Sequence, residues 1–148
     1  GETTPKFASY QAELVQKVRE AGLESRIVFH GKRPQEDLPG LFQGMSLVAA
    51  LSRNEGFGLT VLEAMASGCA VLASEAGAWP EIITEGVHGY TVPCGDVAAT
   101  REKLVELLSE PDRLGRMGTA GRQHAEGHYS VAREVEELSN YYQRWLNT

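Results

Sequence analysis

The residues best suited to chemistry lie in one short stretch, residues 52–73, which reads SRNEGFGLTVLEAMASGCAVLA. Gly56 and Gly58 stand just ahead of a helix-forming run, residues 59–67. Because glycine has no Cβ, both positions can adopt a positive φ and let a ligand approach the backbone closely. The first turn of a helix leaves backbone N–H groups unpaired, and these groups favour an anion together with the helix dipole. The stretch therefore predicts a phosphate-binding turn.

Two carboxylates, Glu55 and Glu63, flank this turn. Thr60 and Glu63 fit the T-x-x-E capping box, which would give Glu63 a purely local role. A helix that starts nearer Gly58 would instead leave the Glu63 carboxylate free to accept hydrogen bonds. Contact between Glu55 and a ligand competes with an ordinary solvated position in a loop. Phe57 is interpreted as a packing residue, and the Thr60 hydroxyl as either a phosphate ligand or a cap.

The turn differs from two common phosphate-binding motifs. It lacks the third glycine of the dinucleotide fingerprint, and no Lys-Ser or Lys-Thr pair completes a Walker loop. The turn does follow an apolar run, residues 47–51, that predicts a buried parallel strand. In open α/β sheets, ligands bind beyond the carboxyl ends of the strands, so the position of the turn suits a ligand.

The remainder of the chain supplies the elements that would hold the turn. Short apolar runs predict strands, and longer runs with helical spacing predict helices. The expected strands are residues 27–29, 47–51, 70–73 and 89–92. The expected helices are residues 10–21, 34–42, 59–67, 79–84, 97–108, 111–125 and 131–146. Residues 1–6 are expected to form a loop, and Asp96 to be an N-cap. The apolar side of the last helix is expected to lie mostly in the core. This alternation indicates a Rossmann-like, doubly wound α/β fold with a parallel sheet and a helical C-terminal tail.

Length and composition narrow the possible classes of protein. A length of 148 residues predicts one domain, and the net charge of −6 gives no indication of a nucleic-acid partner. Cys69 and Cys94 lack metal-site spacing and are interpreted as free thiols. His88, His124 and His128 show no partner in the sequence and receive no role. No apolar run approaches the ~20 residues of a membrane-spanning helix.

The segment EGFGLTVLEAMASG, residues 55–68, resembles the donor-site segment of retaining GT-B glycosyltransferases, which carries the same E-x7-E spacing. Three further segments resemble parts of that family in the same order: IVFHG (27–31), AGAWPEII (76–83) and GVHGYTVPCGD (86–96). One departure is Gly77-Ala78, where the family has two glycines before its glutamate, here Glu81. The resemblance spans nearly the whole chain and is greatest to bacterial lipopolysaccharide-core transferases.

The resemblance implies the carboxyl-terminal, donor-binding lobe of a two-lobed enzyme over residues 1–148, with the acceptor lobe and the first strand of this lobe expected ahead of Gly1. Glu55 would be the catalytic group, touching the donor sugar and stabilising positive charge on its ring, and Glu63 would bind the ribose hydroxyls. Backbone amides would hold the sugar and the β-phosphate at Gly56, Phe57, Gly58, Leu59 and Thr60. The nucleobase or its phosphates would lie beside Gly31, Lys32 and Arg33, although a solvated surface pair is an equal alternative for the two basic residues.

The activity implied is transfer of a hexose of the mannose or glucose type from a nucleotide-sugar, such as GDP-mannose or UDP-glucose, to an acceptor hydroxyl with retention at the anomeric carbon. Neither a metal nor a cofactor is expected. The partners would be the donor and a glycan or glycolipid acceptor of the cell envelope. The full-length enzyme would be cytoplasmic or peripheral on the inner membrane, and this lobe alone would be inactive. Two alternatives remain open, namely a nucleotide-sugar epimerase on the same scaffold and a non-catalytic nucleotide- or sugar-binding module.

Overall fold

The computed structural model describes residues 5–146, and the chain divides into two compact units, residues 1–37 and 38–148. Helix α1 (Pro5–Glu20) and the short 3-10 helix η1 (Gln35–Asp37) belong to the first unit. The predicted loop over residues 1–6 is therefore wrong at residues 5 and 6, since α1 begins at Pro5. Proline is well suited to a first helical position, because the N–H that it lacks would be unpaired there anyway. Residues 1–4 lie outside the described residues.

The strand predicted over residues 27–29 is wrong. This segment is irregular, and its side chains Ile27, Val28 and Phe29 are 40%, 71% and 43% exposed. A strand exists only through hydrogen bonds to a neighbour, and none of the described residues pairs with this segment. The apolar run thus satisfied the local pattern for a strand without a partner to complete it.

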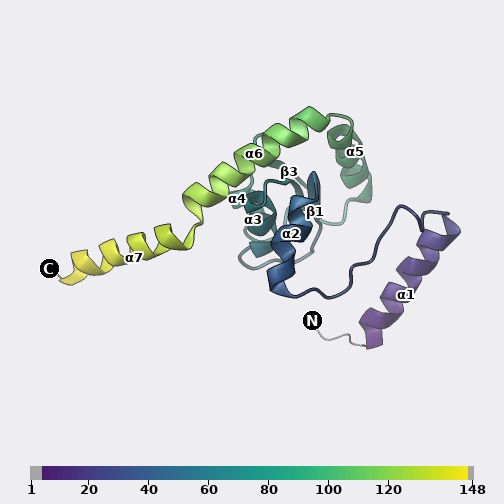
Figure 1. The fold of residues 1–148 in the computed structure, drawn as a ribbon, viewed down its shortest axis with the longest axis horizontal. Helices are drawn as coiled ribbons and strands as arrows, with labels where there is room; N and C mark the ends of the chain where they lie inside the picture. Colours follow the sequence, from purple (N-terminus) through teal and green to yellow (C-terminus); the bar gives the residue numbers. More distant parts are fainter. Residues whose placement is uncertain (1–4, 147–148) are drawn as a thin grey trace. The chain divides into compact units, whose positions relative to one another are not determined.

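The second unit contains a three-stranded parallel sheet in the order β1-β2-β3 (Figure 1). In its register, Leu47 pairs with Ala70, and Val71 pairs with Gly89. Helices connect and follow the strands, which confirms the Rossmann-like α/β fold. The elements in chain order are α2 (Leu38–Gln43), β1 (Leu47–Ala50), α3 (Leu59–Ala66), β2 (Ala70–Ser74), α4 (Trp79–Ile82), β3 (Gly89–Val92), α5 (Val97–Leu108), α6 (Pro111–His128) and α7 (Val131–Leu146).

The central strand β2 is buried along its whole length, and its side chains alternate between two apolar clusters. Val71 and Ala73 pack in the cluster that α3 and α4 supply. Ala70 and Leu72 pack in the other cluster, to which α5 and α6 contribute. Helices therefore cover both faces of the sheet, as a doubly wound fold requires.

Several helix boundaries depart from the predicted ones. The helix predicted over residues 34–42 is divided into η1 and α2, and Pro39 lies in the first turn of α2, where proline is tolerated. Helix α4 has only one turn. Asp96 is the predicted N-cap of α5, since its carboxylate accepts a 2.9 Å hydrogen bond from the Ala99 amide.

The glycines of α6 permit close packing instead of interrupting the helix. A Cβ on Gly118 would lie 2.0 Å from the Gly68 carbonyl oxygen, at the turn that joins α3 to β2. A Cβ on Gly115, one helical turn earlier, would meet nothing within 4 Å. Gly118 therefore lets the α6 backbone lie directly on this turn, and the contact outweighs the poor helix propensity of glycine.

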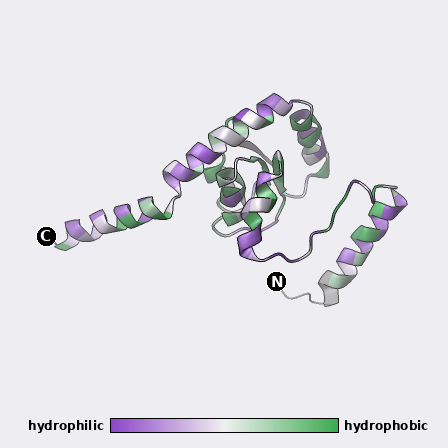
Figure 2. Cartoon of the chain, in the orientation of Figure 1, coloured by the Kyte–Doolittle hydropathy of each residue, from purple (hydrophilic) through white to green (hydrophobic). Residues whose placement is uncertain are grey.

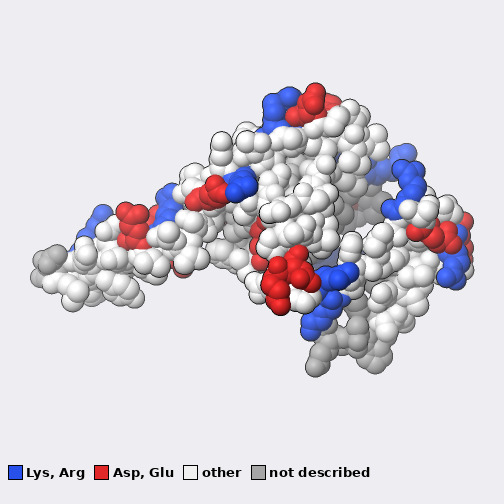
Figure 3. Space-filling view, in the orientation of Figure 1, with Lys and Arg blue, Asp and Glu red and all other residues white. Residues whose placement is uncertain are grey.

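The prediction that α7 lies mostly in the core is wrong. Its apolar side chains are 49% to 85% exposed, and they form a stripe along the helix (Figure 2). A helical spacing shows which face could be buried, but it does not supply a neighbour to bury it. Arg122–Glu126 on α6 and Arg133–Glu137 on α7 are ion pairs at i,i+4 spacing. Figure 3 shows acidic and basic side chains next to one another on the visible face of the molecule. Among residues 5–146, no helix combines the length and apolar character needed to cross a bilayer.

We expect Gly118→Ala to lower the free energy of unfolding by about 1–3 kcal/mol, because the new methyl group would overlap the Gly68 carbonyl. Gly115→Ala is the matched control and should raise the free energy of unfolding by about 0.5–1 kcal/mol, since it removes a helical glycine at an open position. Urea unfolding of both variants measures the difference. Equal effects of the two substitutions would show that the α6 contact with Gly68 is not tight.

Candidate functional site

The turn between β1 and α3 is built as a helix N-terminus whose N-cap is Gly58, with φ of 92° and ψ of 25°. The amides of Val61 and Leu62 donate to the Gly58 carbonyl at 3.1 and 3.3 Å. Thr60 is therefore already inside the helix and cannot be its N-cap. The capping-box alternative for Glu63 is wrong, because the helix starts too early for it.

The amides ahead of these two have no acceptor. Within the described part of the chain, the N–H groups of Gly58, Leu59 and Thr60 donate to no carbonyl or side chain, and no side chain caps α3. Unpaired N–H groups at the positive end of a helix dipole attract an anion. The local geometry thus meets the requirement for a phosphate-binding turn.

The two glycines of the turn differ in what they do. Both glycines could adopt a positive φ, and only Gly58 does so. A Cβ on Gly58 would lie 2.8 Å from Cδ1 of Trp79 and 3.0 Å from Cδ1 of Ile82. A Cβ on Gly56 would meet nothing within 4 Å. Glycine at 58 is therefore required by both backbone conformation and space, while position 56 is merely open.

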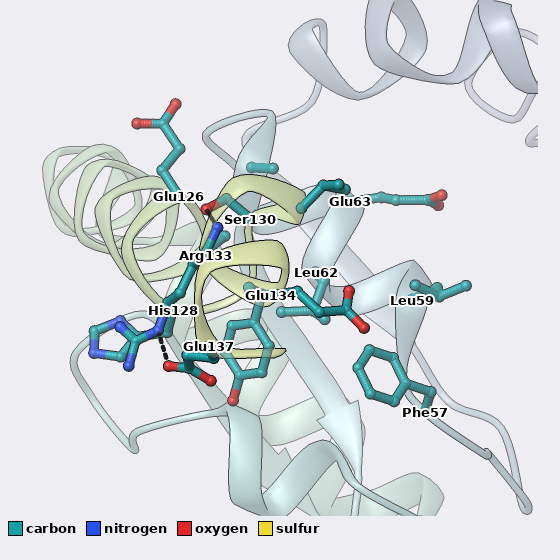
Figure 4. Close-up of a pocket in the computed structure, with 14 residues that line it drawn as sticks. Phe57, Leu59, Leu62, Glu63, Glu126, His128, Ser130, Arg133, Glu134 and Glu137 are labelled. Atoms are coloured by element: carbon teal, nitrogen blue, oxygen red, sulfur yellow. Dashed lines mark hydrogen bonds and ion pairs between the residues drawn. The ribbon is translucent and has the colours of Figure 1, made fainter. Parts of the chain in front are cut away.

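A pocket of about 550 Å³ lies between α3 and the corner where α6 meets α7 (Figure 4). Three of the predicted site residues line it, namely Phe57, Leu59 and Glu63. Its other lining residues are Leu62, Ala66, Ala125, Glu126, His128, Tyr129, Ser130, Val131, Arg133, Glu134 and Glu137. The structure therefore brings Glu63, one of the two predicted acidic residues, to the edge of a pocket, with its carboxylate extending away from the α6–α7 corner (Figure 4).

The other predicted site residues lie outside that lining. Glu55 is half-buried at the start of the turn, and neither its carboxylate nor that of Glu63 has a hydrogen-bond or ion-pair partner among the described residues. Both carboxylates are thus free to accept hydrogen bonds from a ligand. Gly31, Lys32 and Arg33 are exposed and belong to the first unit, so their part in the site stays a prediction.

Residues 77–79, which the sequence marked only by their family resemblance, lie against the turn and support it. A Cβ on Gly77, whose φ is 54°, would lie 2.0 Å from the Glu55 carbonyl oxygen. Trp79 is 1% exposed and packs in the core. Glu81, two residues on, is exposed.

Three histidines that were given no partner in the sequence stack on one another. The ring centroids of His88 and His124 are 4.5 Å apart, and those of His124 and His128 are also 4.5 Å apart. His88 is 3% exposed, and its Nδ1 accepts a 3.2 Å hydrogen bond from the Thr84 amide. Burial, together with the neighbouring imidazoles, lowers the pKa of His88 and of His124 below the ordinary value of 6.5. The stack connects the loop before β3 to the end of α6.

A family model described as "Glycosyl transferases group 1" matches residues 8–124. The chain belongs to this family. It is 35% identical to the lipopolysaccharide core biosynthesis mannosyltransferase LpcC of Rhizobium leguminosarum bv. viciae, over 99% of this chain and 41% of that protein.

Solved structures that resemble the chain include the following two. One is the C-terminal domain of a glycosyl transferase group 1 family protein (LpcC) from Francisella tularensis, with 37% identity, a TM-score of 0.80, and coverage of 86% of this chain and 66% of that one. The other is Anabaena HepE in complex with UDP, with 25% identity, a TM-score of 0.85, and coverage of 95% of this chain and 38% of that one. The chain thus corresponds to a C-terminal GT-B lobe and spans about two fifths of the LpcC relative.

We expect Gly58→Ala to lower the free energy of unfolding by at least about 1–2 kcal/mol, because its Cβ would occupy a left-handed conformation and press on Trp79. Gly56→Ala is the matched control and should change it by less than about 0.5 kcal/mol. Urea unfolding compares the two. The geometry of the turn would be contradicted if Gly56→Ala lowered the free energy of unfolding and Gly58→Ala left it unchanged.

The histidine stack predicts that stability decreases in mild acid. Because the folded pKa values of His88 and His124 lie below 6.5, the unfolded chain takes up protons that the folded chain does not as the pH falls below that value. The stability of the neutral stack is therefore present above about pH 6.5 and is lost progressively below it. Urea unfolding at pH 7.5 and pH 5.5 measures this loss.

His124→Phe keeps a ring in the stack and removes a titrating group. We expect this variant to lose less stability between the two pH values than the unmodified chain. A pH dependence equal to that of the unmodified chain would show that the stack is not the source.

Proposed function

We propose that the chain is the donor-binding half of a retaining glycosyltransferase, which transfers a hexose from a nucleotide-sugar to an acceptor hydroxyl. The observation that carries this proposal is the run of unpaired amides at Gly58, Leu59 and Thr60, flanked by the free carboxylates of Glu55 and Glu63. A nucleotide-sugar presents the complementary groups, namely an anionic diphosphate between two sets of hydroxyls.

The amides suit the chemistry of the leaving group. When the glycosidic bond to the phosphate breaks, negative charge grows on the departing nucleoside diphosphate. Amides held rigidly at a helix N-terminus stabilise that charge more in the transition state than in the ground state. This route uses no metal or cofactor from the protein.

The carboxylates suit the hydroxyls. In this proposal the Glu63 carboxylate accepts hydrogen bonds from both ribose hydroxyls, since one carboxylate has room for two donors. Glu55, at the other end of the turn, contacts the donor sugar and stabilises the positive charge that develops on its ring. The nucleobase or its phosphates would lie beside Gly31, Lys32 and Arg33.

The relatives guide the choice of sugar and acceptor. One is named a lipopolysaccharide core mannosyltransferase, and HepE was solved with UDP. We propose a hexose donor of the mannose or glucose type, activated by GDP or UDP, and a glycan or glycolipid acceptor of the cell envelope. The acceptor would be bound by a second lobe, and closure of the two lobes would complete the site.

The direct test is calorimetric titration of the chain with UDP, GDP, ADP and the matching nucleotide-sugars. We expect saturable binding of at least one nucleoside diphosphate, and no transfer of the sugar to water or to added glycans by the chain alone. Absence of binding for all of them at millimolar concentration would refute the proposal. Measurable transfer by the isolated chain would contradict the need for a second lobe.

The role of Glu63 has its own test. We expect Glu63→Ala to weaken binding of the nucleoside diphosphate by about 1.5–3 kcal/mol, the range for hydrogen bonds to a charged group. Glu102→Ala removes an exposed charge from α5 and is the matched control, expected to leave the affinity unchanged. Calorimetry compares both variants with the unmodified chain, and equal affinity of all three would rule out a ribose contact by Glu63.

A further inference from the structure

The indole of Trp79 is buried beneath the 55–58 turn with its N–H group unpaired. Trp79 is 1% exposed, and its Nε1 has no hydrogen-bond partner. Buried donors without an acceptor are rare in folded proteins, because water can no longer compensate them. A packing role alone would be served as well by an apolar side chain, so the unpaired N–H calls for a separate explanation.

The N–H edge of this indole faces the turn. A Cβ on Gly58 would lie 2.8 Å from Cδ1 and 3.0 Å from Nε1 of Trp79, so these two neighbouring ring atoms lie against the Gly58 backbone. Gly58 is also the first of the residues whose amides are unpaired. The position of the turn is thus determined by its contact with the Trp79 indole.

The same segment touches the other end of the turn. Gly77 lies against the Glu55 carbonyl, where an added Cβ would be only 2.0 Å from the oxygen. Residues 77–79 therefore support the turn at both its first and its last residue. The carbonyls of Gly56 and Phe57, between these supports, accept no hydrogen bond from the described residues, whereas the Gly58 carbonyl already accepts two.

We propose that Trp79 is a positioning residue for the donor phosphate, whose indole supports the 55–58 turn and whose N–H donates to a carbonyl of that turn once the phosphate is bound. The inference rests on the proposed function, because it takes the turn to be the phosphate site. When the diphosphate binds the amides of residues 58–60, a local rotation brings the carbonyl of Gly56 or Phe57 to the indole N–H that is unpaired without ligand, while the contacts at Gly58 and Gly77 stay in place.

Nuclear magnetic resonance can observe this directly, because the chain contains only two tryptophans, Trp79 and Trp145. A ¹⁵N-labelled sample has two indole N–H signals, and Trp145→Phe assigns them. On titration with UDP or GDP, we expect the amides of residues 58–60 and the Trp79 indole proton to move together, the latter downfield. Movement of the amides without the indole would overturn the role of Trp79 and leave the proposed function intact. If neither moves, the proposed function fails and this inference fails with it.

A pair of variants separates positioning from stability. Trp79→Phe keeps an aromatic ring and removes the N–H, and we expect a cooperative fold with roughly tenfold weaker binding of UDP or GDP, the value of one hydrogen bond. Trp145→Phe is the control on α7 and should bind like the unmodified chain. A lower melting temperature for Trp79→Phe with unchanged affinity would show that Trp79 only packs. If Trp79→Phe does not fold, the indole signal of the unmodified chain still decides the question.

Discussion

The structure of this lobe depends on one close approach between two backbone segments. The turn at residues 55–58 lies on residues 77–79 so tightly that Gly77 and Gly58 leave no room for a methyl group. The first glycine admits the Glu55 carbonyl, and the second admits the edge of Trp79. Because both contacts involve backbone, the turn cannot shift without moving the helix α4 that begins at Trp79.

Helix α3, which follows the turn, is also fixed by close packing. Val61, Ala64 and Met65 of α3 are all 0% exposed, and the turn after α3 is covered by the backbone of α6 at Gly118. An anion at the start of α3 would therefore meet donors that need no rearrangement of the helix. Rigid placement of that kind is what makes a dipole effective against a charge that appears only in the transition state.

The charges of the chain act locally. With a net charge of −6, the chain as a whole does not attract an anion. In the proposed function, the attraction would come from three amides and a helix dipole, and Glu55 and Glu63 would accept hydrogen bonds from hydroxyl groups. On the opposite side of the pocket, Arg133 is paired with Glu137 at 2.7 Å, as the dashed line in Figure 4 shows.

The sequence alone predicted the elements whose signals are local. Strands β1, β2 and β3 follow from short apolar runs, Asp96 caps α5 as its type suggests, and the GFG turn before a helix indicates a phosphate site. The resemblance carried by residues 55–68 identified the family that the comparisons confirm. These features need no knowledge of distant neighbours, because propensity, capping and turn geometry act over a few residues.

What depends on distant partners was decided only by the tertiary structure. Residues 27–29 have the pattern of a strand, but no strand among residues 5–146 pairs with them, and the large apolar side chains of α7 are exposed rather than buried. The stack of His88, His124 and His128 joins residues that lie far apart in the sequence. The contact of Gly58 with Trp79 likewise links the N-cap of α3 to the first residue of α4, which lie apart in the sequence. Pairing and packing are properties of two segments at once, so a pattern within one of them cannot specify them.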